Sequence, residues 1–269
     1  MKRIILTMSL VVAVVAWAAP AAAPATSATQ NASAACTALK AKIGATAFTQ
    51  AYATFGQCVS SLAPLEQQNL TSAQAACSAE QSDPNFAASH GGKSFEQFYG
   101  TGKKGKNAFG NCVSTKAKAS SAAEGKARPN PSRTCRSLRS QMGATTFALT
   151  YGKNANDRNA FGKCVAKTAH AQTQNEVSAA SACRAEQADA NFAASHSGKT
   201  FAQFYGTGDL ANAFGKCVAA KASEKSQSQQ QATVSAAKAC ASELQASATA
   251  FKAKYGTFGH CVSLKASGK

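Results

Sequence analysis

Five copies of one short phrase, Phe-Gly-x-Cys-Val, recur along the chain and constrain its fold more than any other feature. The copies begin at Phe55, Phe109, Phe161, Phe214 and Phe258. A further cysteine and a Phe-x-x-x-Tyr pair precede each copy, so the five units use all ten cysteines and all five tyrosines. Repeated residues of these types predict a repeated core. They do not by themselves predict a reaction.

The composition between these landmarks favours α-helix. Ala, Lys, Gln and Glu are frequent, and no segment alternates polar and apolar residues as a half-buried strand does. Phe and Tyr four positions apart lie on one face of a helix, and so do the Phe and Cys of the repeated phrase. We expect the glycine of that phrase to allow close packing. We expect the glycine that follows Tyr in four units to end a helix in the left-handed conformation.

Two kinds of unit alternate. The second and fourth are the longer ones, and the phrase Asn-Phe-Ala-Ala-Ser-His at 85–90 recurs at 191–196. The true period is therefore a pair of units. The predicted fold is an all-α helical repeat array of five disulfide-stapled units, made of two paired repeats of about 105 residues plus a terminal half, in which each unit contacts mainly its neighbours. Segments 163–190 and 216–255 lack Gly and Pro and predict long helices.

The N-terminal residues predict export. A basic start at Lys2 and Arg3, an apolar run and an Ala-x-Ala pattern at 16–18 are typical of a secretory signal peptide. No later stretch is apolar and long enough to span a bilayer. Gly125, Pro129 and Pro131 indicate a hinge. The expected divisions are a signal peptide at 1–18, a flexible N-terminal segment at 19–33, repeat units at 34–62, 72–117, 133–168, 177–222 and 233–266, and a Pro/Gly/Lys linker at 118–132.

The cysteines are expected to form disulfides in a secreted or cell-envelope protein. Their number is even and their placement regular, as in proteins of oxidising compartments. No Cys-x-x-Cys pair is present, which argues against zinc. Since each unit contains one complete pair, consecutive pairing is predicted. The pairs are Cys36–Cys58, Cys77–Cys112, Cys135–Cys164, Cys183–Cys217 and Cys240–Cys261.

The chain is strongly basic, with a formal net charge of +17. Fifteen Lys or Arg and only three acidic residues lie between Lys93 and Lys167. Such charge either keeps the surface soluble or attracts an anionic cell-wall polymer, an anionic lipid surface or another polyanion. The aromatic residues are committed to the core, which argues against a specific nucleic-acid reader. The residues predicted to bind a polyanion are Lys103, Lys104, Lys106, Lys116, Lys118, Lys126, Arg128, Arg133, Arg136 and Arg139.

Other functions are weighed against this one. One set of residues suited to metal binding or proton transfer occurs twice. It consists of Glu80, Asp83 and His90, repeated as Glu186, Asp189 and His196. A secreted enzyme or metal-binding protein that uses this set is an alternative, and an inert structural scaffold is another. Gly92-Lys93-Ser94 lacks the earlier glycine of a phosphate-binding loop, and no cofactor is expected. We expect a non-catalytic protein, and the oligomeric state is left open.

Overall fold

The computed structural model describes residues 27–102, 104–153, 157–208 and 210–268. Within these ranges the chain forms fourteen helices and no strand, and an isolated bridge between Thr101 and Lys106 is the one β-type contact. The all-α prediction is confirmed. The predicted signal peptide at 1–18 lies outside the described residues. No helix in the described ranges has the length and apolar character needed to cross a bilayer.

Each copy of the repeated phrase begins a helix. These helices are α3 (Phe55–Gln81), α6 (Ala108–Ala127), α9 (Ala160–Ala188), α12 (Ala213–Ala246) and α14 (Phe258–Ala266). Helices α3, α9 and α12 continue through the first cysteine of the following unit, so each of them belongs to two units. Helix α12 ends before the expected position 255. The reason is Ser247, which leaves the helix and caps the next one by accepting a hydrogen bond from the Ala250 N–H.

The Phe-x-x-x-Tyr pairs lie on short helices that precede the long ones. These are α2 (Ala45–Tyr52), α5 (Phe95–Tyr99), α8 (Ala144–Tyr151), α11 (Phe201–Tyr205) and α13 (Ala248–Tyr255). The expected left-handed glycine after Tyr is found only at Gly256, where φ is 69°. Gly100, Gly152 and Gly206 have negative φ. A Cβ at any of these three would collide with the carbonyl oxygen four residues earlier, so they are glycines because of close approach.

The remaining helices are α1 (Ala28–Ile43), α4 (Phe86–Ser89), α7 (Pro131–Met142) and α10 (Phe192–Ser195). The start of α1 corrects the flexible segment predicted at 19–33, because residues from Ala28 onward are helical. The side chain of Ser27 accepts from the Gln30 N–H, and the Gln30 side chain accepts from the Ser27 N–H. This capping box satisfies N–H groups that a helix end leaves unpaired, and so fixes where α1 begins.

The linker predicted at 118–132 is also wrong, because α6 continues through it to Ala127 and α7 begins at Pro131. Only three residues, 128–130, separate the two helices, and each of them accepts a hydrogen bond. Lys42 Nζ donates to the carbonyl of Arg128 at 2.9 Å, and Gln172 Nε2 donates to that of Pro129 at 3.3 Å. Asn130 caps α7 by accepting from two backbone N–H groups. The prolines therefore place a helix start here and do not make a hinge.

The five disulfides join consecutive cysteines, the pairing that the repeat order predicts. They are Cys36–Cys58, Cys77–Cys112, Cys135–Cys164, Cys183–Cys217 and Cys240–Cys261. Each bond links the helix before an aromatic pair to the helix after it. All ten cysteines are fully buried. Each unit is therefore closed on itself by one covalent bond in its own interior.

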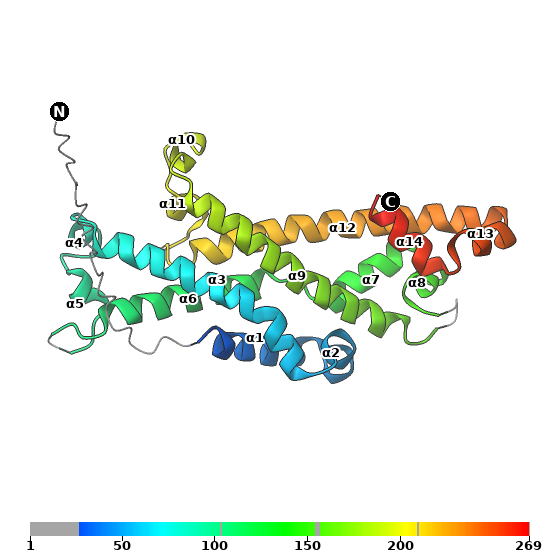
Figure 1. The fold of residues 1–269 in the computed structure, drawn as a ribbon, viewed down its shortest axis with the longest axis horizontal. Coiled ribbons are helices and arrows are strands. Elements are labelled where there is room, and N and C mark those ends of the chain that lie inside the picture. The colour runs from blue at the N-terminus through cyan, green and yellow to red at the C-terminus, as the bar shows by residue number, and fades with distance from the viewer. Residues whose placement is uncertain (1–26, 103, 154–156, 209, 269) are drawn as a thin grey trace, which may run out of the picture.

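The units do not pack as a simple line of neighbours. The first disulfide shares a hydrophobic core with the fourth, and the third shares one with the fifth. The second disulfide lies in a smaller core of its own. Helices α3, α6, α9 and α12 run past one another in the middle of the molecule, and α10 and α11 project as a lobe (Figure 1). The expectation that each unit contacts mainly its chain neighbours is not met, since the long helices carry units past each other.

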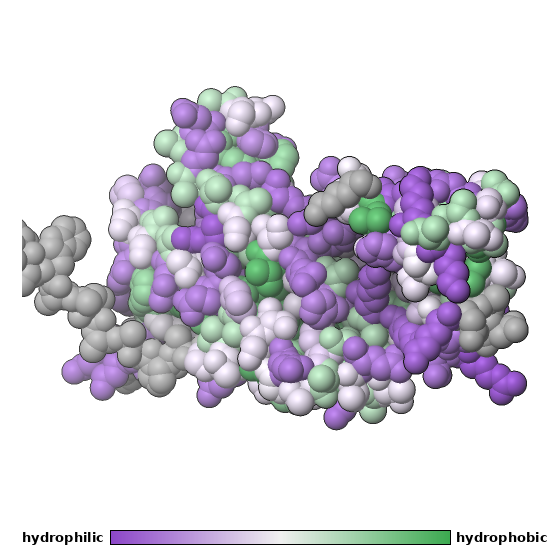
Figure 2. Space-filling view, turned by 45° about the vertical axis from the view of Figure 1, so that its right-hand side comes forward, coloured by the Kyte–Doolittle hydropathy of each residue, from purple (hydrophilic) through white to green (hydrophobic). Residues whose placement is uncertain are grey.

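The face of the molecule drawn in Figure 2 is mostly polar. Figure 2 shows hydrophilic side chains over much of one face, with hydrophobic side chains in small, separate patches. Among the described residues the exposed large hydrophobic side chains are Phe55, Phe98 and Phe204. Phe98 and Phe204 occupy equivalent positions in units two and four. The remaining aromatic side chains lie wholly or partly in the cores that the disulfides close.

Candidate functional site

The repeated glutamates of units two and four form ion pairs next to the disulfide of their own unit. Glu80 accepts from Lys116 Nζ at 2.8 Å and from the Tyr99 hydroxyl at 3.0 Å. Glu186 forms the matching pair with Lys221 at 2.7 Å, and the Tyr205 hydroxyl donates to it at 2.8 Å. The Lys116 side chain is only 7% exposed. Its prediction as a polyanion-binding residue is therefore wrong, because its ammonium group is already paired with Glu80 and covered.

The repeated histidines have a packing role. His90 stacks on Phe86 with ring centroids 3.7 Å apart, and His196 stacks on Phe192 at 3.8 Å. In each case Nδ1 lies 2.8 Å from the carbonyl oxygen of that Phe. The same Nδ1 lies 2.9 Å from the Ser89 hydroxyl in unit two and 3.0 Å from the Ser195 hydroxyl in unit four. Each histidine ring is therefore held by contacts with the Phe that begins the short helix preceding it, α4 or α10.

The repeated aspartates stabilise the turns that precede α4 and α10. Asp83 accepts from the N–H of Asn85 at 2.8 Å, and Asp189 accepts from the N–H of Asn191 at 2.9 Å. Glu, Asp and His of the repeated set therefore contact different partners. Within the ranges that the structure describes, no three His, Cys, Asp or Glu side chains gather as a metal-ligand group.

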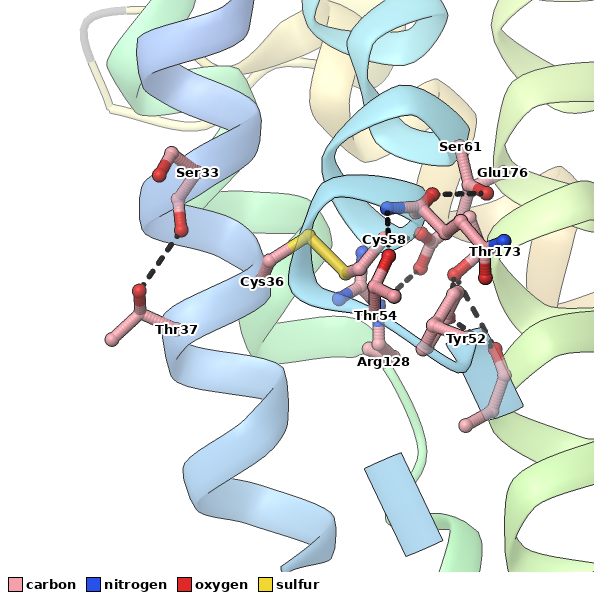
Figure 3. Close-up of a disulfide and its surroundings, with 12 residues drawn as sticks. Ser33, Cys36, Thr37, Tyr52, Thr54, Cys58, Ser61, Arg128, Thr173 and Glu176 are labelled. Carbon is pink, nitrogen blue, oxygen red and sulfur yellow. Dashed lines mark hydrogen bonds and ion pairs between the residues drawn. A yellow bond between two sulfur atoms is a disulfide. The ribbon is translucent and has the colours of Figure 1, made fainter. Parts of the chain in front are cut away.

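Arg128, like Lys116, was predicted to bind a polyanion, and its side chain is also buried. Its Nε donates to Glu176 Oε1 at 2.7 Å and its second guanidinium nitrogen donates to Oε2, which makes a bidentate pair. The two side chains are 9% and 5% exposed. Burial disfavours the charge of Arg128, but Glu176 outweighs it and raises the pKa. Figure 3 shows this pair beside the Cys36–Cys58 disulfide and beside Tyr52, whose hydroxyl lies 2.7 Å from Thr173 Oγ1.

A second buried polar group lies between α3 and α6. Asn69 Nδ2 donates to Glu66 Oε2 and to Glu124 Oε2, each at 3.2 Å, and Ser121 donates to Glu66 at 2.6 Å. Burial, followed by the charge of Glu66, raises the pKa of Glu124 well above its usual value. Burial also raises the pKa of Glu66, against the opposing effect of Ser121 and Asn69. The site therefore favours the protonated form of Glu124.

Two loop lysines of the predicted set are accessible. Lys104 and Lys106 are exposed in the loop before α6, while Lys103 lies outside the described residues. This loop and α7 lie at opposite ends of α6, whose 20 residues span about 30 Å. At physiological ionic strength, charges are screened over about 8 Å. The loop lysines and the α7 arginines therefore form two separate charged regions, with exposed Lys118 and Lys126 on α6 between them.

Helix α7 carries the most concentrated of these charges. Its buried face consists of Pro131, Thr134, Cys135, Leu138 and Met142. Arg133, Arg136 and Arg139 follow one another at three-residue spacing on the exposed side, which we call the α7 arginine face. Among the described residues, none of the three forms an ion pair or a side-chain hydrogen bond. At about 1.5 Å rise per residue, they extend along about 9 Å of helix.

One end of this face borders a pocket of about 360 Å³ that Arg139 and Arg158 both line. The one carboxylate in its wall is Asp157, which accepts from Lys163 Nζ at 2.8 Å and from two backbone N–H groups. Lys163 and these N–H groups lower the pKa of Asp157 to about 2. Asp157 is thus satisfied by other partners, and it does not pair with either arginine.

Comparison with known proteins finds no family model, no curated protein and no solved structure that matches this chain.

Sequence reasoning missed the buried carboxyls, although one signal was present. Leu62, Leu65, Glu66 and Asn69 follow the spacing of a helix stripe that faces a core, and all four are buried. Glu66 and Asn69 could therefore have been predicted as interior residues. Their partner Glu124 could not, because it comes from another helix 55 positions from Asn69.

Proposed function

We propose that this chain is an extracytoplasmic, non-catalytic binding protein that attaches to anionic polymers through the α7 arginine face. The observation that carries the proposal is the row of three exposed guanidinium groups, Arg133, Arg136 and Arg139, without a carboxylate partner. A helix can be kept soluble by charges of both signs. On the exposed side of α7 every charged side chain is positive. Arg158 adds a fourth cation, in the wall of the pocket that Arg139 also lines.

Arginine suits this role because its planar guanidinium donates two parallel hydrogen bonds to a phosphate, sulfate or carboxylate. The remaining part of the predicted set supports the same partner. Lys104, Lys106, Lys118 and Lys126 stay exposed, so an extended polymer that contacts α7 meets further cations along α6. An anionic cell-wall polymer fits this spread of charge better than a small anion does.

The proposed location rests on the disulfides and on the N-terminal sequence. Five buried disulfides are consistent with a protein of an oxidising, extracellular compartment. The basic and apolar start of the chain is typical of a signal peptide. In the envelope or outside the cell, anionic polymers and lipid surfaces are the accessible partners.

The test is retention of the oxidised protein on immobilised heparin, a soluble wall teichoic acid and anionic vesicles. The variant Arg133→Glu/Arg136→Glu/Arg139→Glu is expected to elute at much lower salt than the wild type. The matched control, Lys104→Glu/Lys106→Glu, changes two charges about 30 Å away along α6 and is expected to have the smaller effect per charge. If the triple variant elutes with the wild type, the α7 arginine face is only a solvated surface. If the wild type binds none of the three, the chain acts as an inert scaffold.

A further inference from the structure

A second site lies on the side of α9 that faces α12 and α14. A pocket of about 370 Å³ opens between α8, α9, α12 and α14. Its size is at the lower end of the range typical of ligand sites, about 300–1,000 Å³. Ten of the sixteen lining residues carry a hydroxyl or an amide, although the apolar part of the wall is the larger in area; Lys167 is the one cation, and none of the lining residues is acidic.

Tyr151, in the wall of this pocket, differs from the equivalent tyrosines of the other units. In units two and four the Tyr hydroxyl donates to a Glu three positions after the first cysteine of the unit, and unit five also has a glutamate, Glu243, at that position. Unit three has Leu138 at that position, and Leu138 also lines the pocket. Unit one has Leu39 there, but the hydroxyl of its tyrosine, Tyr52, forms a hydrogen bond with the Thr173 hydroxyl on α9. No described residue receives a hydrogen bond from the Tyr151 hydroxyl, so this phenol is available to a ligand.

Gln172 supplies a second unpaired group. It is only 3% exposed and lines the same pocket. Its Nε2 donates to the carbonyl of Pro129 at 3.3 Å, while its Oε1 is buried and has no hydrogen-bond partner. Leaving a buried acceptor unpaired costs about 1–3 kcal/mol, so such groups call for an explanation. Because this oxygen has no exposed surface, a ligand in the pocket does not contact it, and the Gln172 amide is a fixed part of the wall.

The surrounding polar groups are held in place. Asn175 on α9 donates to Ser226 Oγ at 3.0 Å and to Gln229 Oε1 at 2.8 Å, and both partners belong to α12. These bonds fix the two helices that form opposite walls. Burial raises the pKa of Tyr151 to about 12, so its hydroxyl is a donor at neutral pH. The site is therefore largely formed before a ligand arrives.

We propose that this pocket binds a neutral saccharide through the Tyr151 hydroxyl and the free hydroxyl of Ser263. The hydroxyl groups of a sugar both donate and accept hydrogen bonds, as do the hydroxyl and amide side chains that line the pocket. The wall lacks the carboxylates that a metal ion or an amine requires. A single lysine at the rim gives little preference for a charged ligand, and the ring of Tyr151 offers an apolar surface to a sugar ring.

The experiment is calorimetric titration of the oxidised, full mature chain with hexamers of α-glucan, β-glucan and N-acetylated chitin, each at millimolar concentration. An acetylated and amidated tetraglycine is the peptide probe. Tyr151→Phe removes one hydroxyl, and Ser263→Trp fills the pocket from an exposed position on α14. Tyr205→Phe makes the same change at the equivalent position of unit four and is the matched control.

At least one hexasaccharide is expected to bind with one-to-one stoichiometry. Tyr151→Phe is expected to weaken it about three- to tenfold, the effect of one hydrogen bond. Ser263→Trp abolishes binding and Tyr205→Phe leaves it unchanged, each with an unaltered circular dichroism spectrum. The proposal is overturned if no hexasaccharide binds, if only the peptide binds, or if a saccharide binds equally well to Tyr151→Phe and Ser263→Trp. The α7 triple variant is expected to bind the saccharide as the wild type does, which separates the two sites.

Discussion

At the scale of single residues, Glu66 and Glu124 lie where a negative charge is least stable. They belong to α3 and α6, both are buried, and they share the amide of Asn69. The bidentate Arg128–Glu176 pair lies close enough to act on both electrostatically. Burial outweighs the opposing charge of Arg128, which is already paired with Glu176, so the folded chain binds the Glu124 proton more tightly than the unfolded chain does.

The raised pKa of Glu124 predicts a pH-dependent effect of Glu124→Gln. Unfolded, this carboxyl ionises near pH 4.5, whereas the folded chain holds its proton to higher pH. The wild type therefore loses stability from this residue as the pH rises from 4.5 through the folded pKa. The amide that replaces the carboxyl stays neutral, so the variant gains on the wild type over that interval, by about 1.4 kcal/mol for each pH unit.

Urea unfolding of both proteins across this interval measures the effect. Glu224→Gln is the matched control, since it makes the same change at an exposed position on another helix, α12. A Glu124→Gln variant that becomes less stable relative to the wild type as the pH rises would contradict the raised pKa.

At the scale of elements, the glycine of the repeated phrase shows how far a pattern determines packing. A Cβ at Gly215 would lie 2.6 Å from Ser120 Cα, so α12 and α6 meet through backbone contact at this glycine. At Gly259 the nearest atom is the carbonyl oxygen of Thr150 at 3.3 Å, and at Gly56 it is the Thr54 hydroxyl at 3.9 Å. The prediction of close packing is right for Gly215 and does not hold for Gly56.

These glycines give a matched pair of substitutions. Gly215→Ala is expected to destabilise the chain by about 2–4 kcal/mol, because two helix backbones must separate or strain. Gly56→Ala is expected to be neutral or to stabilise α3 by up to about 1 kcal/mol through helix propensity. Thermal unfolding followed by circular dichroism compares the two. Equal effects of both substitutions would show that α6 and α12 are not in close contact.

The elements predicted well are those whose cause is local. The helices beginning at each Phe-Gly-x-Cys-Val follow from residues a few positions apart, and so does the disulfide that closes each unit. Lys116 and Arg128 were placed wrongly because their partners, Glu80 and Glu176, lie 36 and 48 positions away. Charge and position in a Lys-rich stretch did not reveal that long helices would cover these two side chains. The unpaired hydroxyl of Tyr151 likewise became visible only when unit three was compared with its equivalents in space.

At the scale of the whole molecule, the disulfides close units whose cores are small, and two of the three cores join units that are distant in sequence. Each disulfide is expected to contribute about 3 kcal/mol by restricting the unfolded chain. Full reduction is therefore expected to lower the melting temperature strongly and to remove much of the helical signal. Circular dichroism with and without reductant tests this, and an unchanged melting point after complete reduction would show that packing alone holds the fold.

The second disulfide should be the most local in effect, because its core is built almost entirely from unit two and contains no other disulfide. Replacing Cys77 and Cys112 by Ala is expected to raise hydrogen exchange in α4 and α5 while α9 and α14 keep their protection. Replacing Cys183 and Cys217, whose core is shared with unit one, is expected to affect α1 and α2 as well. Loss of protection throughout the chain after the first change would contradict the separate core.

The most direct test of the central claim is the salt dependence of heparin binding by the oxidised protein. Each cation that neutralises a polymer charge releases counterions and adds about −0.7 to −0.9 to the slope of log affinity against log salt, by the nucleic-acid values. The wild type is expected to show a steep negative slope, and Arg133→Glu/Arg136→Glu/Arg139→Glu a slope shallower by about 2–3. The same slope for both proteins, or no heparin binding by the wild type at low salt, would contradict the assignment of polyanion binding to α7.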